Sequence, residues 1–139
     1  MRTSLHKVFG CLFMLGLLTA CGGKGHSAAP PTDLRAEAGD TQVTLTWTPV
    51  PGVEYWVWSS PQPGVTTQTC MQVFGCNILT KATPPFAVTG LINGIAYSFT
   101  VNGRTDSGPG GSGASPVNAT PRQAARTWSP VKPFSALSI

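Results

Sequence analysis

Hydrophobic and polar residues alternate along two stretches of the chain, residues 42–48 and residues 97–101. In a β-strand, successive side chains point to opposite faces, so a period of two indicates a strand that is buried on one face only. Both stretches are also rich in β-branched and aromatic residues, which strands favour. The side chains expected to face inward are Val43, Leu45, Trp47, Tyr97, Phe99 and Val101.

Further short strands are expected between clusters of turn-forming residues. The candidate strands cover residues 33–39, 53–59, 86–90 and 115–121. The turn signals are Pro51-Gly52, residues 61–64, Pro84-Pro85, Asn93-Gly94 and residues 106–113. Six or seven short strands at such spacing predict an all-β fold, an antiparallel β-sandwich.

The residues of these strands carry a family resemblance. The matching residues in the first half are Pro31 with Leu34, Trp47 on the second strand, and Tyr55 with Val57 on the third. The most specific match comes later in the chain and is Leu91-x-x-Gly94-x-x-Tyr97-x-Phe99-x-Val101. Together they resemble a fibronectin type III domain, which has an immunoglobulin-like sandwich fold. The resemblance spans residues 31–121 and implies that Tyr97 forms a tyrosine corner, with its hydroxyl bonded to the backbone just upstream. Asn93 stands where many members have Pro, and residues 61–83 are longer than usual.

Composition agrees with a turn-rich β-domain. Only 10% of the residues are charged, against about 25% in average soluble domains. The formal net charge is +4, but Arg2 and Lys7 belong to the N-terminal segment and the remaining basic residues are scattered. Nucleic-acid binding needs a clustered basic stripe, so no nucleic-acid partner is expected.

The first twenty residues are typical of an export signal. Arg2 and Lys7 precede an apolar stretch, residues 8–18, that is too short to span a hydrocarbon core of about 30 Å. Leu18-Thr19-Ala20-Cys21 resembles the bacterial lipobox, which implies a signal peptide over residues 1–20 and acyl chains on Cys21. The alternative is an ordinary secretory signal that is cut after Ala20. Because Gly22 and not Asp follows Cys21, the resemblance further implies a lipid-anchored protein of the bacterial outer membrane.

Residues 21–30 contain no large apolar side chain and are predicted to form a flexible tether. At the other end, residues 122–139 are broken by prolines and are expected to be an irregular tail or linker.

Cys70 and Cys76 are expected to form a disulfide, because an exported domain meets an oxidising compartment. A zinc pair would need closer spacing and two further ligands, which the segment after the signal does not offer, so no metal site is expected. The bond would stiffen a turn that presents Met71 and Phe74.

Trp56 and Trp58 fall in the opposite phase to Tyr55 and Val57 and are therefore expected on the outer face of their strand. Together with Phe74 they are the predicted binding residues, since outward Trp side chains mark interaction sites. The alternative is that residues 69–79 fold over the two rings and bury them.

Catalysis is not expected, and neither is a cofactor. The five carboxylates that follow the signal are dispersed, and nothing resembles a nucleophile with its base. Gly108-x-Gly110-x-x-Gly113 matches a dinucleotide motif, but a strand and not a helix follows it. We expect a non-catalytic, lipid-anchored module of the cell envelope that acts by protein–protein interaction. The alternatives are a carbohydrate-binding accessory domain and a passive spacer from a truncated multidomain lipoprotein.

Overall fold

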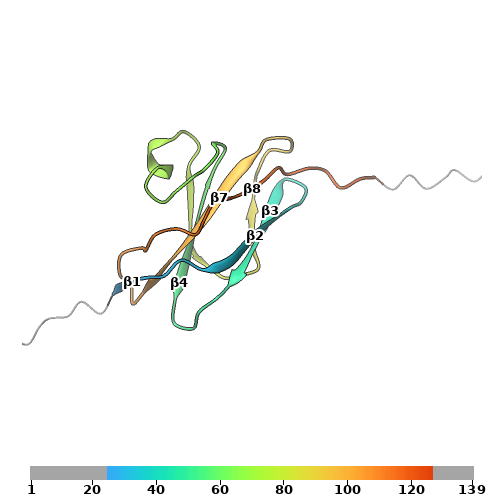
Figure 1. Cartoon of the computed structure of the whole chain (residues 1–139). Coiled ribbons are helices and arrows are strands. Elements are labelled where there is room, and N and C mark those ends of the chain that lie inside the picture. Colours follow the sequence, from blue (N-terminus) through green and yellow to red (C-terminus); the bar gives the residue numbers. More distant parts are fainter. Residues whose placement is uncertain (1–24, 127–139) are drawn as a thin grey trace, which may run out of the picture.

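The computed structural model describes residues 25–126, which form two antiparallel β-sheets packed face to face (Figure 1). The larger sheet has the order β1-β7-β4-β5, with β8 also paired to β7, and the smaller sheet has the order β2-β3-β6. This confirms the predicted all-β sandwich. The elements are β1 (His26–Ala28), β2 (Thr32–Ala38), β3 (Gln42–Thr48), β4 (Glu54–Ser60), η1 (Cys70–Gln72), β5 (Asn77–Ala82), β6 (Phe86–Thr89), β7 (Tyr97–Thr105) and β8 (Val117–Ala119).

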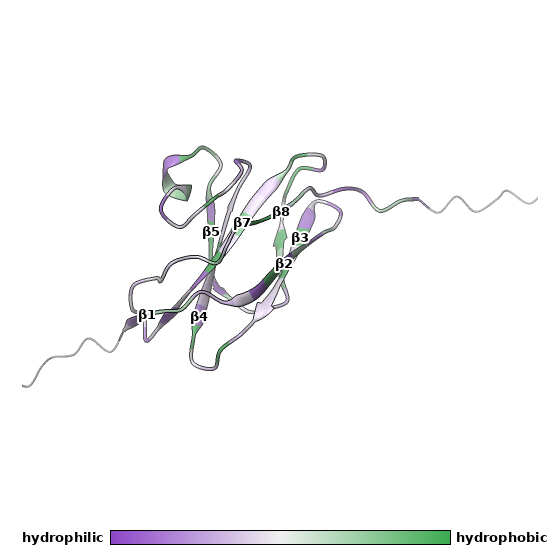
Figure 2. Ribbon diagram, viewed as in Figure 1, coloured by the Kyte–Doolittle hydropathy of each residue, from purple (hydrophilic) through white to green (hydrophobic). Residues whose placement is uncertain are grey.

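The core lies between the sheets, and the residues that alternation pointed inward supply it. Val43 and Leu45 of β3 meet Val57 of β4 and Phe99 of β7, and all four are fully buried. Trp47 packs edge-to-face on Tyr55 across the two sheets, with ring centroids 5.6 Å apart. Hydrophilic residues occur along the same strands as the core residues, as a sandwich requires (Figure 2).

The tyrosine corner is present. The backbone N–H of Ile92 donates to the Tyr97 hydroxyl at 3.2 Å. Asn93, the departure from the family pattern, has its own function here. Its side chain accepts from the Thr41 N–H at 2.9 Å and donates to the Asp40 carboxylate at 2.7 Å. These bonds fasten the turn between β2 and β3 to the loop that precedes β7.

The structure corrects the predicted tether. His26–Ala28 form strand β1, which pairs antiparallel with the end of β7, from His26 opposite Thr105 to Ala28 opposite Gly103. A flexible tether was expected because the segment lacks large apolar side chains. Pairing through backbone N–H and C=O groups needs none, and small side chains let two backbones approach closely.

Strand β5 (Asn77–Ala82) was not predicted, and it pairs with β4 at the edge of the larger sheet. The predicted signal peptide, Cys21 and most of the C-terminal tail lie outside the described residues. Within residues 25–126, no helix is long and apolar enough to cross a membrane.

Candidate functional site

A loop of residues 61–76, here called the cystine loop, joins β4 to β5 and contains η1. The predicted disulfide between Cys70 and Cys76 is present and closes residues 70–76 of the loop, with Cα atoms 5.2 Å apart. The loop is also fastened to the larger sheet, because the backbone N–H of Val65 donates to the Ser98 hydroxyl at 3.1 Å. The cystine loop is therefore an ordered platform.

The cystine loop packs on the outer face of the larger sheet, the face turned away from the smaller sheet. There Trp58, Val65 and Cys70 form a second buried cluster, against which Trp56 and Ile78 also pack. Only 8% of Trp58 is exposed, and its ring N–H donates to the Asn102 side-chain oxygen at 2.9 Å.

The outward phase of the two Trp residues was predicted correctly, but the expected exposed pair is wrong for Trp58. The cystine loop covers this ring, as the alternative expectation proposed. Alternation assigns a side chain to a face of the sheet, and it does not show whether another segment covers that face. Trp58 is therefore mainly a support of the cystine loop, and only a small part of its ring reaches the surface.

Two large apolar side chains of the cystine loop face solvent. Phe74 is 95% exposed and Met71 is 73% exposed. The predicted binding residue Phe74 is thus accessible, and its role in binding stays a prediction.

Trp56, half-buried, carries a cation on its ring. The guanidinium carbon of Arg104 lies 3.3 Å from the ring centroid. The indole N–H of Trp56 donates to the Glu54 carboxylate at 2.7 Å. The antiparallel register produces this arrangement, because it sets Glu54 opposite Arg104 and Trp56 opposite Asn102 on neighbouring strands.

A groove of about 340 Å³ lies beside Trp56 on the outer face. One wall is the cystine loop at Thr67 and Gln68, and the other is a segment of residues 108–113, here called the glycine strap. The lining residues are Trp56, Trp58, Thr67, Gln68, Asn102, Arg104, Gly110, Gly111 and Ser112.

The glycine strap lies very close to the sheet. A Cβ atom on Gly110 would overlap the Asn102 amide and lie 2.8 Å from an Arg104 Nη atom. Asn102 also donates to the Gly111 carbonyl oxygen at 3.0 Å, so one amide ties the strap to Trp58. The Gly-x-Gly-x-x-Gly pattern therefore serves close backbone approach, and no helix follows it.

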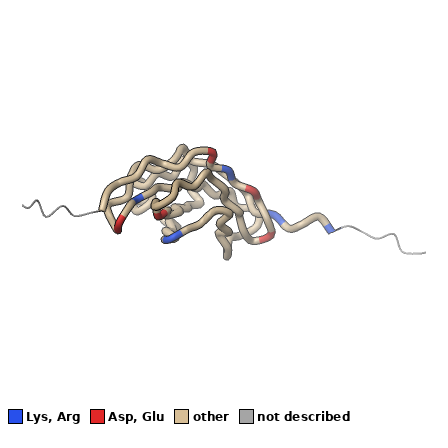
Figure 3. The backbone as a smooth tube through the Cα atoms, turned by 90° about the horizontal axis from the view of Figure 1, so that it is seen from below, with Lys and Arg blue, Asp and Glu red and all other residues tan. Residues whose placement is uncertain are grey.

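Arg104, Asn102 and Gln68 were not among the predicted site residues. A signal for the first two was available, since alternation in β7 puts residues 102 and 104 on the face opposite Phe99 and Val101. Their position beside Trp56 depends on strand register, which the sequence did not provide. Within residues 25–126, no three His, Cys, Asp or Glu side chains gather to hold a metal ion. The charged residues of this part are spread over the domain (Figure 3).

Comparisons with solved structures agree with this architecture. The chain superimposes on a fibronectin type III domain of human contactin 1 with a TM-score of 0.52 and 14% identity, covering 73% of this chain and 84% of that one. It superimposes on a fibronectin type III domain of the human collagen alpha-1(XX) chain with a TM-score of 0.51 and 23% identity, covering 78% and 100%. The fold is fibronectin type III-like.

A bacterial structure also matches. The chain aligns with a β-1,2-glucanase from Parabacteroides distasonis at a TM-score of 0.51 and 16% identity, over 69% of this chain and only 13% of the glucanase chain. No family model and no curated protein matches the sequence. At these identities the likenesses establish the fold and nothing about activity.

Proposed function

We propose that this protein is a non-catalytic, lipid-anchored binding module of the bacterial outer membrane, and that it binds a partner protein through the cystine loop. The observation that carries the proposal is Phe74, which is 95% exposed at the tip of a loop closed by a disulfide. Burying such a side chain in a partner's pocket would contribute roughly 1.5–3 kcal/mol. The disulfide and the buried cluster beneath the loop fix its conformation before binding, which reduces the entropy lost on association.

The position of the cystine loop supports a protein partner over insertion into the bilayer. β1 and the start of β4 lie on opposite sides of β7 at the same level, since both pair with it at Arg104, and the cystine loop follows the other end of β4 (Figure 1). Seven strand residues at about 3.3 Å each separate the two ends by roughly 20 Å. Acyl chains on Cys21 would be only four residues from Gly25, a span of at most about 14 Å. Such an anchor would hold the β1 end near the membrane and leave Phe74 farther from it, because Gly75 beside Phe74 lies against Pro61 at the other end of β4.

The hydrogen bonds of the carboxylates support a non-catalytic function. Asp33 accepts from the Thr48 hydroxyl, Asp40 from the Asn93 amide, and Glu54 from the Trp56 indole. Asp33 and Asp40 thus fasten one segment of the sandwich to another, and Glu54 bonds within its own strand.

The test is photo-crosslinking in living cells, with Phe74 replaced by benzoyl-phenylalanine and adducts identified by mass spectrometry. Ile92 is the matched control position, because it is 65% exposed in a different loop. We expect a discrete protein adduct from position 74 that is absent from position 92. Equal adducts from both positions, or none from position 74, would contradict the proposal and favour a passive spacer.

A second candidate function is glycan binding. The groove beside Trp56 favours it, because polar side chains adjoin the ring there.

A further inference from the structure

The fold holds the Arg104 side chain in place, but the protein provides few hydrogen-bond acceptors for its guanidinium group. Its guanidinium is stacked on Trp56, and its neighbour across the ladder, Glu54, gives its carboxylate to the Trp56 indole. The hydrogen bond from Arg104 to the Gly108 carbonyl is long, 3.4 Å, and its buried Nε has no hydrogen-bond partner. A guanidinium is a planar fork whose preferred acceptor is a carboxylate. The groove therefore contains a positioned cation that lacks a strong acceptor.

The remaining lining suits a sugar ring. Thr67 and Ser112, which carry hydroxyls, and Gln68, which carries an amide, line the groove together with Trp56. Asn102 is already engaged on both sides of its amide, since its oxygen accepts from Trp58 and one of its two N–H groups donates to Gly111. A volume of about 340 Å³ is at the lower end of the range for small-molecule sites, about 300–1,000 Å³, so the groove has room for one sugar unit.

We propose that this groove binds the acidic sugar of a glycan, a uronic acid whose carboxylate accepts hydrogen bonds from the Nη atoms of Arg104. The ring hydroxyls would pair with Thr67, Gln68 and Ser112. This inference deepens the second candidate function and rests on it, and it is independent of protein binding by Phe74. The glycine strap forms one wall, so its glycines keep the site open.

The test is calorimetric titration of the detergent-solubilised full chain at about 150 mM salt, where the screening length is about 8 Å. The probes are glucuronic acid and galacturonic acid, with glucose, galactose and acetate as references. We expect a uronic acid to bind at least tenfold more tightly than the neutral sugars and than acetate. Equal affinity for uronic acid and neutral sugar would overturn the proposal. Equal affinity for uronic acid and acetate would overturn the sugar assignment.

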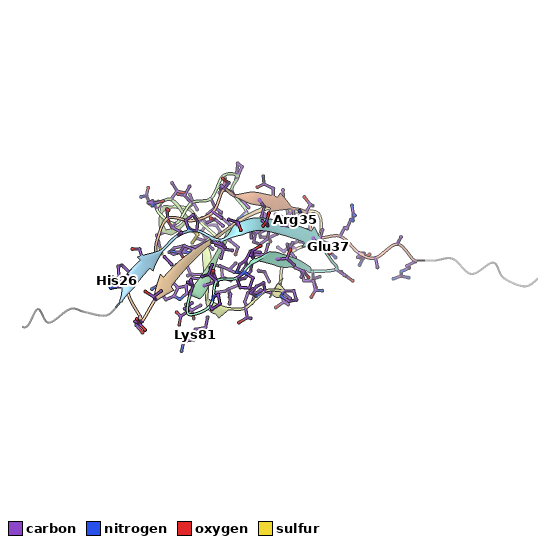
Figure 4. The ribbon with its side chains drawn as sticks, turned by 60° about the horizontal axis from the view of Figure 1, so that its bottom comes forward. His26, Arg35, Glu37 and Lys81 are labelled. Carbon is purple, nitrogen blue, oxygen red and sulfur yellow. A yellow bond between two sulfur atoms is a disulfide. The ribbon has the colours of Figure 1, made fainter. Side chains whose placement is uncertain are left out.

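Two variants locate the site. Arg104→Gln should lower uronic-acid affinity at least tenfold, and Arg104→Lys should restore only part of it, because a lysine lacks the planar fork. Arg35→Gln is the matched control, because it removes the same charge from an exposed position on β2 in the smaller sheet (Figure 4). An equal loss in Arg35→Gln would show that net charge alone governs binding and would overturn the proposal.

Gly110→Ala tests the wall of the groove without changing charge. Its added methyl group would meet Asn102 and Arg104. We expect loss of uronic-acid binding with an unchanged crosslink from position 74. Loss of the crosslink with retained uronic-acid binding would contradict this site and leave the sugar elsewhere on the chain. The two readouts therefore separate failure of this inference from failure of the protein-binding proposal.

Discussion

Because Trp58 is buried, we predict that its truncation lowers the free energy of unfolding substantially. Trp58→Ala removes a side chain that is only 8% exposed, and it empties the centre of the cluster beneath the cystine loop. Truncation of a buried Trp typically costs about 3–5 kcal/mol of unfolding free energy. The loss of the bond to Asn102 also leaves a buried amide oxygen without its donor, a defect of about 1–3 kcal/mol that overlaps with the first figure. We expect a total decrease of about 3–5 kcal/mol, against a typical domain stability of about 5–15 kcal/mol.

Equilibrium urea unfolding of the full chain, followed by circular dichroism, measures this decrease. With a slope of about 1–3 kcal/mol per molar urea, the midpoint should fall by more than 1 M while the slope is unchanged. Phe74→Ala is the control. It removes a similar apolar side chain that is 95% exposed, and we expect a change within about 0.5 kcal/mol. A loss below 1 kcal/mol in Trp58→Ala would refute the burial argument and return Trp58 to the list of accessible binding residues.

Three further predictions concern the covalent links and the tyrosine corner. Replacing Cys70 and Cys76 together by Ser should lower the unfolding free energy by roughly 2 kcal/mol, and a reducing agent should have the same effect on the natural chain in urea unfolding. Tyr97→Phe removes the acceptor of the Ile92 N–H and should cost about 1 kcal/mol in the same assay, and an unchanged midpoint would contradict this contribution. Cys21→Ser should move the protein out of the membrane fraction after cell fractionation, because stable anchoring requires acyl chains, whereas continued sedimentation with membranes would exclude the anchor.

The sequence predicted the sandwich and much of its core, because period-two alternation alone fixes the face on which a strand's side chain lies. Val43, Leu45, Phe99 and Val101 are fully buried, as alternation indicated. The tyrosine corner followed from the resemblance and is also present.

The prediction was incomplete where pairing depends on the backbone. β1 was missed because its pairing with β7 uses backbone groups and needs no large apolar side chain, so its composition is the same as that of a tether. β5 was missed because it lies in the unusual segment of residues 61–83, for which the family pattern gives no guide.

The candidate site was predictable in its residue types but not in its arrangement. The sequence assigned Trp56 and Trp58 to the same face, yet the structure buries one and leaves the other half-exposed beside Arg104. Coverage by the cystine loop buries Trp58, and the antiparallel register of β4 and β7 places Trp56 beside Arg104. Neither is a local property of the chain.

The two proposed binding surfaces share one buried support. Trp58 lies beneath the cystine loop that presents Phe74, and it donates to Asn102, whose amide holds the glycine strap over the groove. A substitution at Trp58, which also lines the edge of the groove, should therefore weaken protein binding and sugar binding together. Phe74 lies in the cystine loop, whereas Arg104 lies in the groove. A substitution at either residue should therefore impair one function and leave the other intact. Loss of both activities in an Arg104 variant that unfolds at the normal urea midpoint would show instead that one surface binds a single partner.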